Sequence, residues 1–429
     1  MKYYSLNDYD IKASFKSAAI TGIAPDKGLY FPESIPQLDA EFIKNIEQYS
    51  NTEIALRVIT PFIGDEIPQH ILKKIVEETL SFDFPTIEVE KYIYALELYH
   101  GPTLAFKDVG ARFMSRCLNY FTQDENKKIT ILVATSGDTG GAVASGFLGV
   151  EGINVLILYP SGKVSNIQEK QLTALGQNIT ALEVDGSFDD CQDMAKQAFL
   201  DEELRNINLT SANSINIARW LPQMFYYFFV YKQLKHLGKP LAVSVPSGNF
   251  GNICAGLMAK KIGLPIAHFI AATNVNDTVP RFMETQDYKP SPTIETLSNA
   301  MDVSNPSNFI RILELFGKRF ESLELELSSN SFSDPQTLAT ISKLYKEHNY
   351  LADPHGAVGY LGLKQYMDEN PNYTGIFLET AHPVKFPESV EKELGIKIPV
   401  PKSLQPLLKK EKSSICIKSY NELKDYLLL

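Results

Sequence analysis

The stretch from His100 to Gly110 carries the lysine that is best placed to do chemistry. Lys107 stands where an alternating, strand-like run ends and a helix-like run over residues 112–121 begins. Side chains at strand ends of α/β proteins face a crevice rather than the core. Residues 104–106 are apolar and would partly desolvate the ammonium, which lowers an amine's pKa and lets it form an imine with an aldehyde. A lone lysine in such a loop is more often a solvated surface cation, so this interpretation depends on the rest of the chain.

A glycine turn over residues 246–252 is a candidate anion site. It follows a β-branched strand at 241–245 and precedes a predicted helix at 253–262. Glycines let the backbone approach a ligand closely, and the N–H groups of the loop and of the helix N-terminus attract negative charge. Taken alone, the motif is explained equally well by a plain tight turn. The chain has neither GxGxxG nor a Walker sequence, which argues against dinucleotides and nucleoside triphosphates.

A second glycine turn lies between a predicted strand at 129–134 and a predicted helix at 142–148. Its candidate residues are Thr135, Ser136, Gly137, Asp138 and Thr139. Two such turns in successive α/β halves suit a crevice that binds a small anionic molecule from both sides.

Three further segments offer polar groups next to predicted elements. The segment 213–220 supplies a hydroxyl, an amide and a guanidinium at a helix start, a reasonable seat for a phosphate ester, from Ser214, Asn216 and Arg219. Thr380 follows the last apolar strand at 376–379, and capping of the next helix is its alternative role. Asp353 and His355 precede another helix, where they could be an ordinary helix-start residue and a polar rim residue.

The composition is that of a soluble globular protein, with 429 residues, 44% hydrophobic and 21% charged. A net charge of −10 argues against nucleic acid as a partner. No apolar run is long enough for a membrane span, and the N-terminus has no secretory h-region, so we expect a cytoplasmic protein. The four cysteines, Cys117, Cys191, Cys254 and Cys416, lack metal-ligand spacing and are expected to be buried thiols, and no metal site is expected.

Short apolar strands alternate with helices from residue 91 onward, which predicts an α/β fold with parallel sheets. We expect two open, largely parallel sheet domains flanked by helices, and an extra N-terminal segment. The expected division is 1–90 for that segment, 91–237 for the first half and 238–429 for the second. The loop-rich stretch 274–308 is a candidate cover over the site.

Together these motifs resemble the threonine synthase family. The motifs that carry the resemblance occur in the order HGPTLAFKD, SGDTG, NSINIARW, SGNFGN, DPHGAVG and LETAHP. Each glycine turn alone is a weak signal, but the motifs together are a strong one. The resemblance implies a fold-type II enzyme, similar to the tryptophan synthase β subunit, that uses pyridoxal 5'-phosphate (PLP). It implies that Lys107 holds PLP as a Schiff base and that Thr380 meets the pyridine nitrogen. It assigns the PLP phosphate to Gly248, Asn249, Phe250, Gly251 and Asn252.

The family resemblance also implies a substrate site and a reaction. The turn at 135–139 would bind the amino-acid carboxylate, with Asp138 in place of the asparagine that many relatives carry. The implied reaction converts O-phospho-L-homoserine and water to L-threonine and phosphate by β,γ-elimination and water addition, with Lys107 as the general base. The N-terminal segment and the length of the chain resemble the longer bacterial and fungal type of the family. We expect the protein to act as a monomer or homodimer. A serine or threonine dehydratase, another phosphoamino-acid lyase and a non-catalytic amino-acid-binding relative remain as alternatives.

Overall fold

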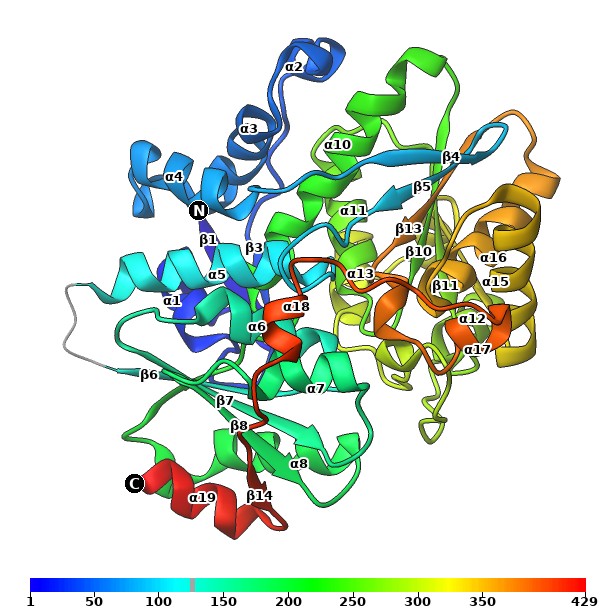
Figure 1. The fold of residues 1–429 in the computed structure, drawn as a ribbon. Coiled ribbons are helices and arrows are strands. Elements are labelled where there is room, and N and C mark those ends of the chain that lie inside the picture. Colours follow the sequence, from blue (N-terminus) through cyan, green and yellow to red (C-terminus); the bar gives the residue numbers. More distant parts are fainter. Residues whose placement is uncertain (124–127) are drawn as a thin grey trace. The chain divides into compact units, whose positions relative to one another are not determined.

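The computed structural model describes residues 1–123 and 128–429, and they form two compact units (Figure 1). Unit 1 comprises Met1, Phe31–Phe106 and Trp220–Pro399. Unit 2 comprises Lys2–Tyr30, Lys107–Arg219 and Val400–Leu429. The stretches expected from the sequence follow the chain in order, whereas each unit gathers segments from several of them.

Unit 1 is built on a six-stranded sheet with the order β12-β11-β10-β13-β5-β4. Its strands are β4 (Thr86–Glu90), β5 (Ile93–Glu97), β10 (Leu241–Pro246), β11 (His268–Thr273), β12 (Leu327–Ser331) and β13 (Thr374–Glu379). All neighbouring strands are parallel except β4 and β5. Every residue of β10 and of β13 is buried, as expected for central strands of a sheet that is covered on both faces.

The helices of unit 1 pack on this sheet or on one another (Figure 1). The α-helices are α2 (Ala40–Lys44), α3 (Asn51–Ile63), α4 (Gln69–Thr79), α10 (Met224–Leu234), α11 (Gly251–Lys261), α12 (Thr278–Thr285), α13 (Phe309–Leu315), α14 (Phe320–Glu324), α15 (Asp334–His348), α16 (Pro354–Glu369) and α17 (Val390–Leu394). The 3-10 helices are η1 (Ile46–Gln48), η2 (Gly64–Glu66), η4 (Leu221–Gln223), η5 (Lys235–Leu237), η6 (Asn299–Met301) and η7 (Pro383–Lys385). Helix α16 packs against β10, β11 and β13, so its start lies beside the middle of the sheet.

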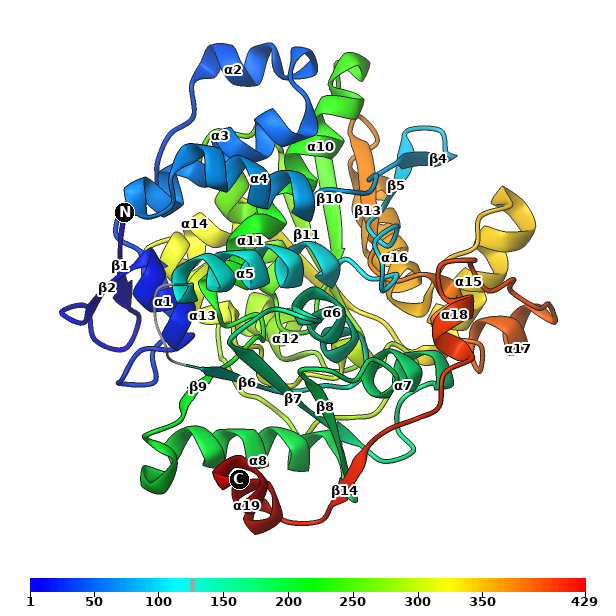
Figure 2. The same cartoon turned by 60° about the vertical axis from the view of Figure 1, so that its left-hand side comes forward.

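Unit 2 contains a five-stranded, fully parallel sheet with the order β14-β8-β7-β6-β9. Its strands are β6 (Ile129–Ala134), β7 (Ile153–Pro160), β8 (Ile179–Val184), β9 (Asn208–Thr210) and β14 (Ile415–Ile417), and an antiparallel pair joins β1 (Lys2–Ser5) to β2 (Lys12–Ser14). The helices are α1 (Phe15–Thr21), α5 (Lys107–Thr122), α6 (Asp138–Phe147), α7 (Asn166–Thr173), α8 (Phe188–Leu200), α18 (Gln405–Leu408), α19 (Tyr420–Leu428) and η3 (Glu202–Leu204). Strand β3 (Tyr30–Pro32) and helix α9 (Ile217–Trp220) lie where the chain passes from one unit to the other. Helices α6 and α7 lie on one face of the parallel sheet and α8 on the other (Figure 2).

The predicted fold class is confirmed, because both units have a mainly parallel sheet flanked by helices. Helical structure over 217–237 is interrupted by η4, where Pro222 removes a backbone donor. The C-terminal tail contributes β14 as an edge strand paired with β8. The loop-rich stretch 274–308 contains the short helices α12 and η6.

Within the described residues, no helix is both long enough and apolar enough to cross a membrane.

Candidate functional site

Lys107 is the first residue of α5, and its side chain is half-buried. The loop that precedes it turns sharply at Leu104, whose φ of 57° lies in the left-handed region. The structure therefore confirms that a strand, a short irregular loop and a helix meet at this lysine, as the sequence predicted. Its bond to a cofactor remains a prediction.

The residues just before Lys107 are fastened to the segment that follows β13. Three hydrogen bonds join them: Phe106 N–H donates to the Thr380 carbonyl (2.9 Å), His382 N–H to the Leu104 carbonyl (3.1 Å), and Lys385 Nζ to the Thr103 carbonyl (3.1 Å). The hydroxyl of Tyr226 donates to the Phe106 carbonyl. Both backbone polar groups of Phe106 are thus held, and the chain enters Lys107 from a fixed position.

The carboxyl ends of three neighbouring strands carry the candidate residues of unit 1. Strand β13 lies between β10 and β5, with Phe377 opposite Ser244 and Glu379 opposite Glu97. Because the three strands are parallel, the loops that leave them emerge at the same edge of the sheet. That edge carries the loop that leads to Lys107, the Thr380 segment and the glycine turn after β10, which the sequence did not by itself place side by side.

The glycine turn after β10 is held tightly on its outer side. Asn249 accepts from residues 307 and 308: its carbonyl receives the Asn308 N–H (3.2 Å) and Asn308 Nδ2 (3.0 Å), and its Oδ1 receives the Ser307 N–H (3.3 Å). Phe250 has a φ of 59°, in the left-handed region, and is the N-cap of α11. The turn is therefore a loop held by hydrogen bonds at the N-terminus of α11.

Asn252, in the first turn of α11, presents a hydrogen-bond donor that no described residue uses. Its Oδ1 accepts from the Tyr227 hydroxyl at 2.7 Å. Its Nδ2 is buried and has no hydrogen-bond partner within residues 1–123 and 128–429. A buried donor without an acceptor costs roughly 1–3 kcal/mol. An anionic group at this helix N-terminus would satisfy it, so the turn fits the phosphate of PLP.

The turn at residues 135–139 in unit 2 joins β6 to α6. Thr135 is buried, and its Oγ1 accepts from the N–H groups of Gly137 and Gly140, both at 2.9 Å, so this hydroxyl shapes the turn itself. Gly137 has a φ of 133°, which few other residues adopt. Ser136 and Thr139 are partly exposed and are the hydroxyls that a ligand can reach.

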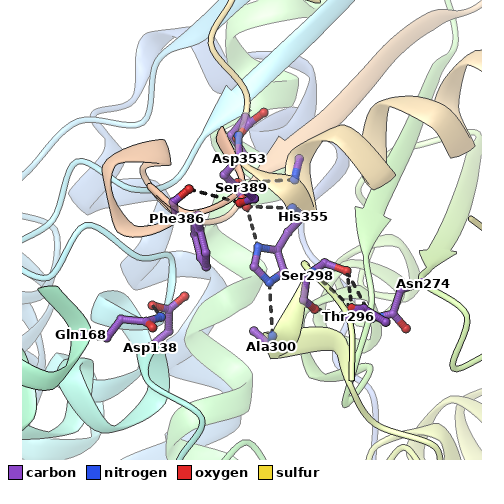
Figure 3. A network of polar contacts seen from close by, with 12 residues as sticks. Asp138, Gln168, Asn274, Thr296, Ser298, Ala300, Asp353, His355, Phe386 and Ser389 are labelled. Atoms are coloured by element: carbon purple, nitrogen blue, oxygen red, sulfur yellow. Dashed lines mark hydrogen bonds and ion pairs between the residues drawn. The ribbon is translucent and has the colours of Figure 1, made fainter. Parts of the chain in front are cut away.

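Asp138 is buried at the start of α6 and is bonded to a residue that the motif search missed. Gln168 Nε2 donates to Asp138 Oδ1 at 3.0 Å (Figure 3). The same side chain caps α7, since its Oε1 accepts from Ser165 N–H at 3.2 Å. The spacing Ser165-x-x-Gln168 is a capping-box signal that could have placed Gln168 at a helix start, but not against Asp138.

The structure places Asn216 and Arg219 inside unit 2. Asn216 Nδ2 donates to the carbonyls of Ala19 (2.9 Å) and Ser211 (3.3 Å), and its Oδ1 accepts from the Ala218 N–H (2.9 Å). Arg219 is 4% exposed and donates from Nη1 to the Ala212 carbonyl at 2.5 Å. Ser214 is half-buried. Their expected contact with a substrate phosphate remains a prediction.

A buried acidic pair lies at the start of α16. Asp353 caps this helix through bonds from His355 N–H (2.8 Å) and Gly356 N–H (3.4 Å), and it also meets His355 Nδ1 at 2.5 Å. Glu379 is fully buried next to it, and its Oε2 accepts from the Asp353 N–H at 3.4 Å. Burial first, and then repulsion from Asp353, raise the pKa of Glu379 well above its usual range. Sequence analysis missed Glu379, because an acid at the end of an apolar strand carries no motif.

No cluster of three or more histidine, cysteine or acidic side chains that could hold a metal ion occurs in the described part of the chain.

The family model for "Pyridoxal-phosphate dependent enzyme" matches residues 80–375, which is most of the chain. The protein is therefore a PLP-dependent enzyme, and the donor at Asn252 agrees with that cofactor. Models for the threonine synthase N terminus and the threonine synthase C-terminal region match residues 2–80 and 356–427. The chain belongs to the threonine synthase family.

Individual relatives agree over the full length. Threonine synthase of Escherichia coli (strain K12) is 46% identical over 431 residues, covering 100% of this chain and 98% of the relative. Its crystal structure superposes with a TM-score of 0.94 and covers 99% of that chain. Threonine synthase of Haemophilus influenzae is 47% identical over 435 residues, with 100% of both chains covered. A PLP-bound threonine synthase from Brucella melitensis is 35% identical with a TM-score of 0.92, covering 100% of this chain and 98% of that chain.

Proposed function

We propose that this enzyme converts O-phospho-L-homoserine and water to L-threonine and phosphate. The full-length similarity to threonine synthases supports this reaction, and the observation that carries the cofactor's part is the unsatisfied donor of Asn252 at the N-terminus of α11. When bound, PLP supplies an electron sink that weakens the Cα–H bond of an amino acid.

The proposed roles divide between residues that bind the cofactor and residues that bind the substrate. Lys107 holds PLP, the turn at 248–252 binds its phosphate, and the Thr380 hydroxyl meets the pyridine nitrogen. A hydroxyl cannot hold that nitrogen protonated as a carboxylate would, so the ring is a weaker electron sink. The turn at 135–139 binds the substrate carboxylate, with the accessible hydroxyls of Ser136 and Thr139 as its direct donors.

Lys107 is also the proposed general base. Its Nζ takes the Cα proton of the substrate and returns protons as the charge moves toward Cβ, which allows the γ-phosphate to leave. The bonds that hold both backbone polar groups of Phe106 support this role, because a base needs a fixed approach to the carbon that it deprotonates. Ser214, Asn216 and Arg219 are the proposed binding residues for the leaving phosphate. Because Asn216 and Arg219 are tied to backbone carbonyls, their part would be to shape the seat from within.

Product analysis tests the reaction. The purified enzyme with PLP is incubated with O-phospho-L-homoserine, and threonine, phosphate and 2-ketobutyrate are measured. Threonine and phosphate in equal amounts are expected. Ketobutyrate in place of threonine would indicate a dehydratase or lyase, and no turnover with retained amino-acid binding would indicate a non-catalytic relative.

We further propose a cytoplasmic location, with the chain acting as a monomer or homodimer. All four cysteines are free, which suits a reducing compartment. Cys117, Cys191 and Cys254 are buried as expected, whereas Cys416, on the edge strand β14, is exposed. Burial raises the pKa of Cys254 to about 12, so this thiol is not a nucleophile at neutral pH. Cell fractionation and sedimentation would test the location and the number of chains.

A further inference from the structure

The backbone of residues 300 and 301 packs directly against the proposed phosphate turn. A Cβ built on Gly248 would lie 2.8 Å from the Ala300 carbonyl oxygen and 2.8 Å from Met301 Cα. Real Cβ atoms do not approach backbone so closely, so the position of this backbone and that of the turn depend on each other. Whatever holds residue 300 therefore also holds residue 248.

Ala300 is held from its other side by a histidine. The Ala300 N–H donates to His355 Nε2 at 3.3 Å, and His355 Nδ1 meets Asp353 Oδ1 at 2.5 Å (Figure 3). The carboxylate oxygen is an acceptor, so the proton of the neutral ring lies on Nδ1 and the lone pair of Nε2 faces Ala300. A defined tautomer thus accepts a backbone N–H one residue from the contact with Gly248.

His355 has little freedom to move. Its side chain is 3% exposed, and its ring lies 5.1 Å from the ring of Phe386. Its partner Asp353 is fully buried and is anchored as the N-cap of α16. The acceptor is therefore fixed to α16, a helix that packs on the central strands of the sheet.

We propose that His355 is a positioning residue for the phosphate turn: by accepting from Ala300 N–H it keeps residues 300 and 301 pressed against Gly248, and so keeps the turn in its phosphate-binding shape. The inference rests on the proposed assignment of residues 248–252 to the phosphate of PLP. It concerns binding and not the chemical step, because His355 acts through the backbone of residue 300.

The test compares two ligands that differ only in the phosphate. Full-length apo-protein is titrated with PLP and with pyridoxal, and both dissociation constants are measured by equilibrium dialysis. His355→Leu removes the acceptor, and we expect about tenfold weaker binding of PLP, the scale of one hydrogen bond, with pyridoxal binding unchanged. His355→Gln can place an amide oxygen near the position of Nε2 and should bind PLP within about threefold of the wild type.

Two further variants make the outcome decisive. His70→Leu, at an exposed histidine, is the matched control and should change neither constant. His355→Asn, which is polar but too short to reach Ala300, should reproduce the loss of PLP affinity and replaces His355→Leu if that variant does not fold. Equal weakening of both ligands, or unchanged PLP affinity, would overturn the role of His355.

Gly248→Ala separates this inference from the assignment on which it rests. Its Cβ must displace the backbone at residues 300 and 301, so PLP binding should weaken and pyridoxal binding should not. If Gly248→Ala leaves the preference for PLP over pyridoxal intact, the turn is not the phosphate site and both proposals fail. If Gly248→Ala lowers the preference and His355→Leu does not, only the role of His355 is wrong.

Discussion

Replacing Glu379 with glutamine should stabilise the protein at neutral pH. The Glu379 side chain is fully buried, and its Oε1 has no hydrogen-bond partner among the described residues. Burial and the nearby Asp353 carboxylate raise its pKa well above the usual range, so the folded protein keeps this carboxyl protonated. The substitution Glu379→Gln keeps the shape and the neutral character of the side chain while removing its ability to ionise.

The magnitude follows from the proton that unfolding releases. In the unfolded chain the carboxyl ionises with a pKa of about 4.3. Above that pH the unfolded state binds one proton fewer than the folded state, so the free energy of unfolding falls as the pH rises, by up to about 1.4 kcal/mol per pH unit until the folded pKa is reached. Glu379→Gln has no carboxyl to ionise at this position, so its free energy of unfolding does not fall for this reason as the pH rises. Its advantage over the wild type should be near zero below about pH 4.3 and reach about 2 kcal/mol by about pH 6.

Urea unfolding of the apo-protein measures this difference. The chain has one tryptophan, Trp220, which lies in the same unit as Glu379 and is fully buried, so its fluorescence reports on the unfolding of that unit. Free energies are compared between about pH 5 and about pH 8, with Glu388→Gln as the control at a solvent-exposed glutamate. If the difference between Glu379→Gln and wild type does not change with pH, Glu379 ionises in the folded protein as it does in the unfolded chain, and the reasoning is refuted.

Three substitutions test the proposed site. Lys107→Ala should abolish both the absorbance of the imine between the protein and PLP and turnover, and a variant that keeps both would contradict its role. Asn252→Leu removes the Nδ2 donor and should weaken PLP binding about tenfold in equilibrium dialysis, with pyridoxal binding unchanged. If the affinities for PLP and pyridoxal change equally, Asn252 does not donate to the phosphate. Gln168→Leu should raise KM about tenfold by freeing Asp138 from its bond. Ser165→Ala, which removes only the bond from Gln168 N–H to the Ser165 hydroxyl that caps α7, should leave KM unchanged. Equal effects of the last two would point to helix capping alone.

Much of the fold is predictable because its signals are local. Short β-branched runs that precede glycine turns identify β6 and β10 to within a residue of their observed bounds. The same reasoning predicts that Lys107 lies where a strand and its loop give way to a helix, which the structure confirms. These features need only the residues within one turn or one strand of each position.

Elements that depend on distant partners were not predictable in this way. Strand β14 has three residues, and it exists because β8 offers an edge more than 200 positions earlier in the chain. The bond between Gln168 and Asp138 spans 30 positions and joins two helices whose approach no periodicity encodes. The pairing of Glu379 with Asp353 is of the same kind, since each residue alone looks like an ordinary strand end or helix cap.

Some of the motif residues form hydrogen bonds that hold the local backbone, and others have side chains that a ligand can reach. Thr135 and Asn216 were predicted to bind substrate, yet the bonds of both side chains shape the backbone around them. A short motif includes every residue that the turn requires. Sequence spacing therefore cannot distinguish a residue that stabilises the turn from a residue that contacts the ligand. Burial can, since Ser136 and Thr139 are accessible while Thr135 is not.

The position of β13 explains why one strand end carries both a buried acid and a candidate cofactor contact. Glu379 is the last residue of β13, and Thr380 is the first residue after the strand. Glu379 lies against the start of α16, where a Cβ on Gly356 would come within 2.0 Å of its Oε1. The glycine of the DPHG motif therefore makes room for the acid. If Gly356→Ala unfolds the protein and adding Glu379→Ala restores folding, the contact between residue 356 and Glu379 is the reason that this position requires glycine. The DPHG motif then reflects packing against Glu379.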